Sequence, residues 1–318
     1  MTANIKKYKA IFLMAFALLL SSCFRSNSPA DMVHVSNHNQ IFDFETVDDL
    51  HKFLTYSEKR VPLISAHRGG PAADYPENAM ETFQRIAYKT PAIIECDIAM
   101  SKDSVLILMH DETLQRTSTG KGAVNKHTLE ELKALNLKDT DGKITNYKIP
   151  TLEETLRWGI GKVIFTLDVK RNVPYRLVVD AIRKTGAEAY SIIITYNADQ
   201  ASLVHNLAPE LMISAPIRSA DDLLRLSDRD VPDTRVVAFL GTSMVEKSVT
   251  DLLHQHGIMC ILGTMGNLDK QARQSGDQRY AEFIDQGADI ISTNRPIQAG
   301  KALSYYIKKR KLSSPYIN

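Results

Sequence analysis

The chain has 318 residues, with a hydrophobic content of 44% and a charged content of 24%, values close to the averages of globular proteins. This composition excludes a wholly disordered chain and a membrane protein with many spans, and the length suits one large domain or two ordinary ones. The formal net charge of +2 gives no support for nucleic acid as a partner, because nucleic-acid-binding domains carry a strong basic excess.

The first residues predict a lipoprotein signal peptide over residues 1–22. Three lysines lie within residues 6–9, and residues 11–20 form an apolar stretch about half as long as a membrane span. Residues 20–23 read Leu-Ser-Ser-Cys and resemble the bacterial lipobox, in which the cysteine becomes acylated. We therefore expect an exported protein that is anchored to a bacterial membrane by a lipid on Cys23 and faces the periplasm.

Residues 23–60 are expected to form a tether and then an N-terminal helical segment. Val47, Leu50 and Leu54 recur at helical spacing within residues 46–56, which predicts a short helix with one apolar face. We expect this helix to pack on the exterior of the barrel that the following residues predict.

Between residues 61 and 310, short β-branched runs alternate with amphipathic helical stretches, a pattern typical of parallel βαβ units. Eight such units without a change in composition predict an α/β fold, a single TIM (β/α)8 barrel. The predicted strands are Val61–Ala66, Ala92–Ile98, Lys162–Val169, Ser191–Tyr196, Leu211–Pro216, Arg235–Leu240, Ile258–Gly263 and Asp289–Thr293. Predicted helices include Asn78–Lys89, Leu152–Trp158, Tyr175–Lys184 and Val245–His256.

A further apolar run, Val105–Met109, follows the second strand after a turn that is too short for a parallel crossover. We expect it to be the return arm of a hairpin, which would place His110 across from Glu95 and Asp97. Residues 112–150 are polar and irregular, and we expect them to form an insertion at the top of the barrel.

Unusual polar residues lie at the C-terminal ends of the predicted strands, which form the catalytic face of a TIM barrel. They are His67 and Arg68 after the first strand, Glu95 and Asp97 in the second, Asp168 and Lys170 at the third, and Asn294 and Arg295 after the eighth.

Glu95 and Asp97 lie two residues apart on a strand, so both side chains point to the same side. Two carboxylates at this place repel each other unless a cation lies between them. A hard divalent ion, Mg²⁺ or Ca²⁺, is the natural occupant, with Asp168 as a third ligand. Neutralisation by Arg68 and Lys170 is one alternative. A glycosidase with paired carboxylates is another, although it would leave the two histidines unused.

His67 and His110 can exchange protons near neutral pH. Hydrolysis of a phosphodiester needs one group that removes a proton from the attacking hydroxyl and another that protonates the leaving alkoxide. Two histidines beside a carboxylate cluster therefore favour a metal-dependent phosphodiesterase, in which Arg68 and Lys170 contact the phosphate oxygens.

The order and spacing of these residues resemble the glycerophosphodiester phosphodiesterase family over roughly residues 61 to 300. The motifs that carry the resemblance include His67-Arg68-Gly69, Glu77-Asn78, Glu95-x-Asp97, His110-Asp111, Leu114-x-Arg116-Thr117, Leu167-Asp168-Val169-Lys170 and Thr293-Asn294-Arg295-Pro296. The resemblance implies a TIM barrel, dependence on one divalent cation, and hydrolysis of glycerophosphodiesters to glycerol 3-phosphate and an alcohol. By matching position it implies an acid/base pair of His67 and His110, metal ligands Glu95, Asp97 and Asp168, a phosphate contact at Arg68, and supporting residues Glu77, Asn78 and Asp111.

Some positions depart from the family pattern. Asp168 stands where glutamate is common, Asn294 stands where aspartate is common, and residues 261–267 lack the aromatic residue often found there. These differences leave the reaction class unchanged and the substrate open. A phosphodiesterase acting on lysophospholipid or sphingolipid headgroups, and a non-catalytic lipoprotein that holds phosphorylated ligands, remain as alternatives. The sequence does not choose between Mg²⁺ and Ca²⁺, between water and a glycerol hydroxyl as nucleophile, or among oligomeric states.

Overall fold

The computed structural model of the chain describes residues 40–318. The predicted signal peptide at residues 1–22, the predicted anchor Cys23 and the predicted tether up to residue 39 lie outside the described residues. Within residues 40–318, no helix combines the length and the apolar character that crossing a membrane requires.

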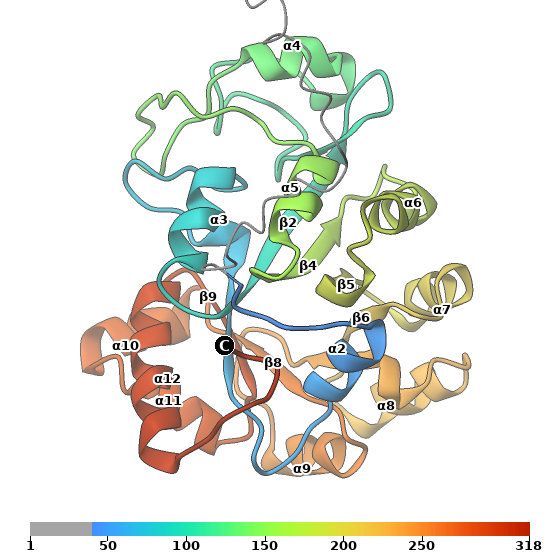
Figure 1. Cartoon of the computed structure of the whole chain (residues 1–318), viewed down its shortest axis with the longest axis vertical. Helices are drawn as coiled ribbons and strands as arrows, with labels where there is room; N and C mark the ends of the chain where they lie inside the picture. Colours follow the sequence, from blue (N-terminus) through green and yellow to red (C-terminus); the bar gives the residue numbers. More distant parts are fainter. Residues whose placement is uncertain (1–39) are drawn as a thin grey trace, which may run out of the picture. The chain divides into compact units, whose positions relative to one another are not determined.

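Within this part of the chain, eight parallel strands close into a barrel, which confirms the predicted TIM fold (Figure 1). Each parallel strand is hydrogen-bonded to the next one along the chain, and the first and last strands also pair. The strands are β1 (Leu63–Ala66), β2 (Ala92–Met100), β4 (Ile164–Val169), β5 (Ser191–Ile194), β6 (Met212–Pro216), β7 (Val236–Phe239), β8 (Cys260–Gly263) and β9 (Ile290–Thr293).

Helices surround the barrel and cover its outer face (Figure 1). They are α3 (Met80–Ala87), α5 (Leu152–Gly159), α6 (Tyr175–Thr185), α7 (Ala198–Leu207), α8 (Ala220–Ser227), α9 (Lys247–Gln255), α10 (Asn267–Ser275), α11 (Arg279–Asp285) and α12 (Pro296–Arg310). Their beginnings follow local sequence rules. At α5, for example, the Thr151 hydroxyl accepts a hydrogen bond from the Glu154 amide, and the Glu154 carboxylate accepts one from the Thr151 amide.

The predicted hairpin is confirmed. Strand β3 (Leu106–Leu108) runs antiparallel to β2, with Ile98 opposite Leu108. Residues 112–150 then leave the barrel as predicted and contain the 3-10 turn η2 (Val124–Lys126) and helix α4 (Leu129–Ala134). The insertion has its own small apolar cluster, which includes Leu114, Leu132 and Ile149.

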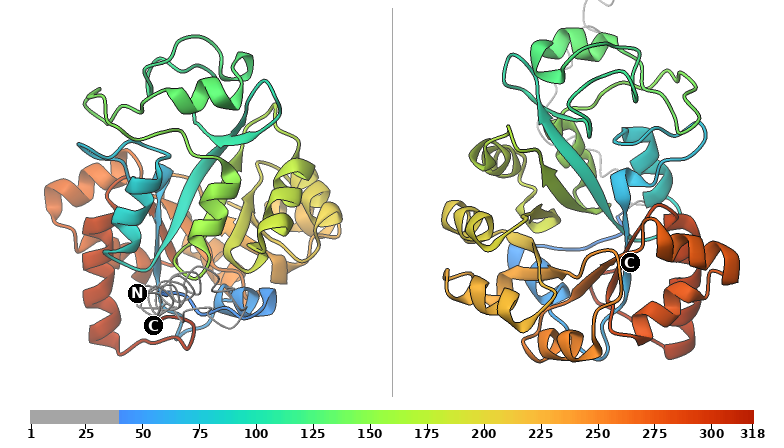
Figure 2. Two further views of the ribbon diagram at one scale, coloured as in Figure 1. Left: turned by 45° about the horizontal axis from the view of Figure 1, so that its top comes forward. Right: turned by 180° about the vertical axis from the view of Figure 1, so that it is seen from behind.

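The short helix predicted for residues 46–56 forms as α2 (Val47–Phe53), but the predicted position on the barrel exterior is wrong. Leu50 and Phe53 of α2 pack instead against inward-facing strand residues such as Ile93 and Ile290. The reason is that the N-terminal end of the barrel interior is apolar and has to be shielded from water. Figure 2 shows α2 at one end of the barrel and the insertion at the other.

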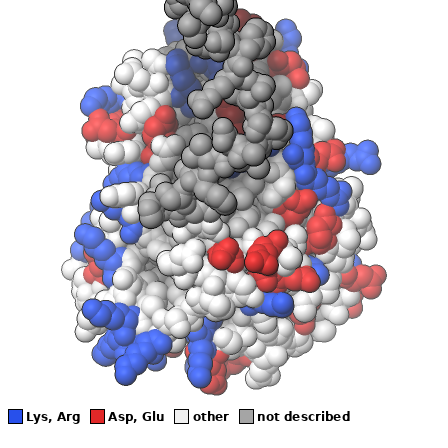
Figure 3. Space-filling view, in the orientation of Figure 1, with Lys and Arg blue, Asp and Glu red and all other residues white. Residues whose placement is uncertain are grey.

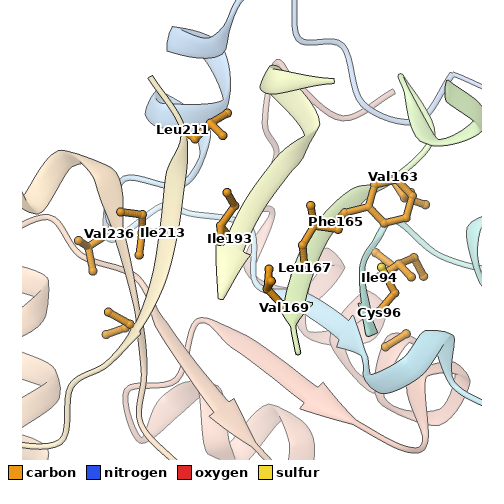
Figure 4. Close-up of a cluster of buried hydrophobic side chains, with 14 of the residues drawn as sticks. Ile94, Cys96, Val163, Phe165, Leu167, Val169, Ile193, Leu211, Ile213 and Val236 are labelled. Carbon is orange, nitrogen blue, oxygen red and sulfur yellow. The ribbon is translucent and has the colours of Figure 1, made fainter. Parts of the chain in front are cut away.

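The strand period of two gives each barrel strand a different inner and outer face. Outward side chains such as Cys96 and Leu167 pack beneath the helices (Figure 4). On the inner face of β2, the chain passes from Ile93 at the closed end to Glu95 and then to Asp97. The interior therefore changes from apolar to acidic towards the C-terminal ends of the strands, where the candidate site residues lie.

Candidate active site

Glu95, Asp97 and Asp168 lie on the adjacent strands β2 and β4, with Asp97 directly opposite Asp168. All of them are buried, and one carboxylate oxygen from each lies within 4.8 Å of the others. Burial, and then the neighbouring charge of Asp97, raise the pKa of Glu95 well above its ordinary value. This crowding of carboxylates indicates that a positive charge belongs at the site.

The donor set fits a hard divalent cation, since Mg²⁺ and Ca²⁺ take carboxylate oxygens as ligands. The Glu95 Oε2 atom accepts a hydrogen bond of 2.6 Å from the Arg68 amide. The Glu95 Oε1 atom has no hydrogen-bond donor within residues 40–318 and is left as a ligand. Glu95, Asp97 and Asp168 are therefore the residues that could hold such an ion.

Lys170 lies between two of these carboxylates. Its Nζ donates hydrogen bonds to Asp97 Oδ1 at 2.6 Å and to Asp168 Oδ2 at 2.7 Å. Burial opposes the charge on Lys170, but the two carboxylates outweigh burial and raise the lysine pKa above its ordinary value. An ammonium group has three N–H bonds, so one donor is left for the predicted contact with a phosphate.

Asn78 orients Asp97 from the loop that precedes α3. Its Nδ2 donates to Asp97 Oδ2 at 2.7 Å, and its Oδ1 accepts a hydrogen bond of 3.0 Å from the Asp97 amide. The φ angle of Asn78 is +55°, so it stands outside the helix, and α3 begins at Met80 rather than at the predicted Asn78. This left-handed conformation is one that asparagine tolerates better than most residues.

The loop after β1 carries His67 and Arg68 into the site. Arg68 has a φ angle of +52°, which is strained for a residue with a side chain. The Arg68 Nη1 atom donates to both oxygens of Glu77 at 3.2 Å, while Nη2 makes no hydrogen bond within residues 40–318. Arg68 is thus held in place and keeps donors for an anionic ligand.

His67 is oriented by the residue that follows the adjacent strand β9. Its Nδ1 lies 2.7 Å from Asn294 Oδ1, and the Asn294 amide donates to the buried Asp269 at 3.0 Å. An amide oxygen can only accept, so Nδ1 carries the proton and Nε2 keeps a lone pair. Burial, with a smaller contribution from Arg68, lowers the pKa of His67 and favours the neutral ring, although Asn294 opposes the shift.

His110 is held by a chain of charged groups. Its Nδ1 donates to Asp111 at 2.7 Å, and Arg116 binds both Asp111 and Glu77. The hydrogen bond from Arg116 holds the pKa of Asp111 well below its usual range. Because Glu77 also binds Arg68, this chain connects His110 to the loop that carries His67.

A cavity of about 390 Å³ opens at the barrel mouth. His67, Glu95 and Asp168 line one side of it, while His110 does not line it. Sequence reasoning missed Tyr196, which also lines the cavity and whose hydroxyl donates to Asp168 Oδ1 at 2.5 Å. Its place at the end of a predicted strand, on the same face as Asp168, was the available signal.

A second group of metal-type ligands, His254, Cys260 and Asp289, lies at the N-terminal ends of β8 and β9. The fully buried Asp289 accepts hydrogen bonds from Arg60, from His254 and from the Cys260 amide, at 2.5, 2.9 and 2.7 Å. The charge of Asp289 is thus balanced by Arg60, which indicates a structural ion pair.

Comparisons with known proteins agree with this geometry. The model of the glycerophosphoryl diester phosphodiesterase family matches residues 67–298. A glycerophosphodiester phosphodiesterase of Bacillus altitudinis is 31% identical over 75% of this chain and 96% of that protein. The crystal structure of a glycerophosphoryl diester phosphodiesterase from Parabacteroides distasonis is 40% identical, with a TM-score of 0.80 over 84% of this chain and 94% of that one.

A phosphodiesterase from Oleispira antarctica, solved in complex with its product sn-glycerol-3-phosphate, shares the fold. It is 19% identical, with a TM-score of 0.62 over 77% of this chain and 97% of that one. The chain spans 63% and 65% of the length of two further curated relatives.

Proposed function

The chain belongs to the glycerophosphoryl diester phosphodiesterase family, and from this membership we propose that it hydrolyses glycerophosphodiesters to glycerol 3-phosphate and an alcohol. The observation that carries the proposal is the convergence of His67 with the carboxylates of Glu95 and Asp168 on one cavity. A module that only binds phosphorylated ligands has no need of a proton-transferring group beside the ion-binding carboxylates.

The ion would be held by Glu95, Asp97 and Asp168. When bound, Mg²⁺ or Ca²⁺ polarises the phosphate and neutralises part of its charge. The free Nη2 donors of Arg68 and the third N–H of Lys170 would bind the non-bridging oxygens. These cationic contacts orient the diester with its phosphorus beside His67.

The two histidines divide the proton transfers. His67, neutral and with a lone pair on Nε2, is suited to accept a proton from the attacking hydroxyl of water or of the glycerol group. His110, whose orientation Asp111 fixes, would then protonate the leaving oxygen. Glu77 contacts both Arg68 and Arg116 and so connects the loop that carries His67 to the residues that hold His110.

The proposal is tested with the full-length protein on glycerophosphodiesters and lysophospholipids, with Mg²⁺ and Ca²⁺ in turn. His67→Ala and His110→Ala should each lower kcat by about 100- to 10,000-fold while circular dichroism stays unchanged. His256→Ala is the control. His256 directly follows α9, is exposed, pairs with Asp233 and does not line the cavity. Substantial turnover in either catalytic variant would refute the assignment, and activity on p-nitrophenyl glycosides alone would favour a glycosidase.

For the residues outside the described range, we propose export and anchoring through Cys23 on a bacterial membrane, facing the periplasm. The support is the sequence of residues 1–23. Cys23→Ser should move the protein from the membrane fraction to the soluble fraction. An unchanged distribution between these fractions would contradict the anchor.

A further inference from the structure

The cavity at the barrel mouth has two chemically different halves. One half carries His67, Glu95 and Asp168, where the phosphate of a diester would bind. The other half is formed by the C-terminal ends of β5 to β8, and its lining includes Tyr196, Pro216, Arg218, Phe239, Gly241 and Met265. Because the cavity continues past the carboxylates, the distal half has room for one alcohol of a diester bound at them.

Arg218 is a cation with no protein partner in the distal half. Its side chain passes the end of β7 at Gly241, where a β-carbon added to the glycine would lie 3.6 Å from the Arg218 Cδ atom. The guanidinium makes no hydrogen bond or ion pair within residues 40–318. A guanidinium that no carboxylate neutralises is available to a ligand.

Asp222, four residues after Arg218, makes its hydrogen bonds to other groups. Asp222 Oδ2 accepts hydrogen bonds from the Arg218 amide at 2.9 Å and from the Ser219 hydroxyl at 3.1 Å. Asp222 Oδ1 accepts a hydrogen bond of 2.8 Å from Arg225 Nη1. Asp222 therefore fixes the backbone at the start of α8 and leaves the charge of Arg218 uncompensated.

The cations beside the ion-binding carboxylates already have partners. Lys170 binds two carboxylates, and Arg68 binds Glu77. Among the described residues that line the cavity, the only acids are Glu95 and Asp168, which belong to the ion-binding cluster. Among the described residues that line the distal half, Arg218 is therefore the one that carries a full charge.

We propose that Arg218 forms an anion-binding subsite for the alcohol that enters the distal half, so that the enzyme favours glycerophosphodiesters in which this alcohol carries a negative group. The inference rests on the proposed function and names its substrate class. Planar guanidinium groups bind phosphate and carboxylate through paired hydrogen bonds. The rings of Tyr196 and Phe239 could attract a quaternary ammonium group, but the charge of Arg218 repels it.

The test compares three diesters of glycerol 3-phosphate with the full-length enzyme. Bis(glycerophospho)glycerol carries a second phosphate in its alcohol, glycerophosphoglycerol is neutral there, and glycerophosphocholine is cationic. The wild type should give the highest kcat/KM with the first and the lowest with the third. Arg218→Gln should lower the anionic-to-cationic ratio by about tenfold, mainly through KM. Arg218→Glu should reverse the preference, and Arg218→Lys should retain most of it.

Arg225→Gln is the matched control, because Arg225 is an exposed arginine of α8 that does not line the cavity. It should leave the ratio unchanged. A ratio that stays unchanged in Arg218→Glu, while the wild type hydrolyses the panel, overturns the subsite and leaves the proposed function standing. An equal loss of kcat/KM on all three diesters in Arg218→Gln also overturns the subsite, since Arg218 would then act in a step that all three substrates share. A wild type inactive on every diester overturns the proposed function and the subsite together.

Discussion

At the scale of single residues, one ligand of the proposed ion is oriented by a neighbour that carries no charge. The Tyr196 hydroxyl donates to Asp168 Oδ1 at 2.5 Å. Burial, and then the bond to Asp168, raise the pKa of Tyr196 far above its ordinary value, so the phenol stays protonated and keeps donating. Hydrogen bonds of this kind orient a metal ligand and tune its basicity.

Tyr196→Phe should therefore weaken the binding of Mg²⁺ or Ca²⁺ by about 10- to 100-fold, measured by calorimetric titration. Tyr175→Phe is the control, because the Tyr175 hydroxyl contacts Ile194 and Gln200 rather than a carboxylate of the cluster. Equal ion affinities in Tyr196→Phe and in the wild type would show that the hydroxyl does not support the ion.

The surroundings of His67 predict how the activity depends on pH. Burial lowers the pKa of His67 below its ordinary value of 6.5, so the ring is neutral at pH 7 and gains a proton only in more acidic solution. A general base loses activity as the pH falls through its pKa, and the acidic limb of the wild-type profile should therefore lie below pH 6.5.

Asn294→Asp places a carboxylate beside Nδ1 and stabilises the protonated ring, which raises the pKa of His67. The acidic limb of kcat/KM against pH should move upward by the same amount. Asn294→Ala tests the alternative that any change at this position moves the limb, because it removes the amide without adding charge. A limb that keeps its place in Asn294→Asp would mean that His67 is not the base.

At the scale of elements, the turn between β1 and α3 holds a strong local constraint. Gly69 has a φ angle of +80°, and a β-carbon there would lie 2.3 Å from the ring of Phe83. The turn brings the Arg68 amide to Glu95, so the close approach of backbone and helix is part of how the site is built.

Gly69→Ala combines a left-handed backbone with a steric clash, and it should lower the free energy of unfolding by about 2–4 kcal/mol in urea titrations. Gly142→Ala is the control, because Gly142 has nearly the same φ angle, +79°, with open space around it. It should cost only about 1 kcal/mol. Equal losses in the two variants would show that contact with Phe83 is unimportant.

Predicting the elements from sequence succeeded where the signal is local. All eight barrel strands overlap their predicted ranges, because a short β-branched run is a property of neighbouring residues in the chain. The predicted helix Asn78–Lys89 began too early, since the position of Asn78 is decided by hydrogen bonds to Asp97 on another element. The packing of α2 was missed for the same reason, because only the closed barrel creates the apolar end that this helix covers.

In the candidate site, too, the sequence predicted what depends on local spacing and missed what depends on contacts between distant segments. The strand period placed Glu95 and Asp97 on one face, and the ends of parallel strands brought Asp168 beside them. The bridge that Arg116 forms between Asp111 and Glu77 depends on how the insertion folds back, and no spacing in the sequence encodes that path.

At the scale of the whole molecule, the barrel separates a stabilising end from a reactive end. Its N-terminal end is filled with apolar side chains, whereas its C-terminal mouth gathers buried carboxylates. On the face seen in Figure 3, positive and negative side chains are interspersed, as expected for a formal net charge of +2. The electrostatics of the barrel mouth is thus set by the charged groups at the mouth rather than by the net charge of the surface.

The buried carboxylates also link ion binding to the stability of the whole molecule. Glu95, Asp97 and Asp168 repel one another in the folded state only, so an ion that binds there stabilises folding without being held by the unfolded chain. At an ion concentration of about 100 times Kd, the gain is roughly 2.7 kcal/mol. For a domain of this size we expect Tm to rise by several degrees when Mg²⁺ or Ca²⁺ replaces EDTA.

A double substitution tests whether this gain in stability comes from the cluster of Glu95, Asp97 and Asp168. Glu95→Gln combined with Asp168→Asn should abolish the rise of Tm with Mg²⁺ or Ca²⁺. Cys260→Ser, in the second group of metal-type ligands, should leave the rise intact, since Arg60 already balances Asp289 there. Calorimetry of the three proteins with and without ion distinguishes these outcomes. A rise that survives in the double variant would place the ion away from the barrel mouth, and with it the chemistry proposed for His67.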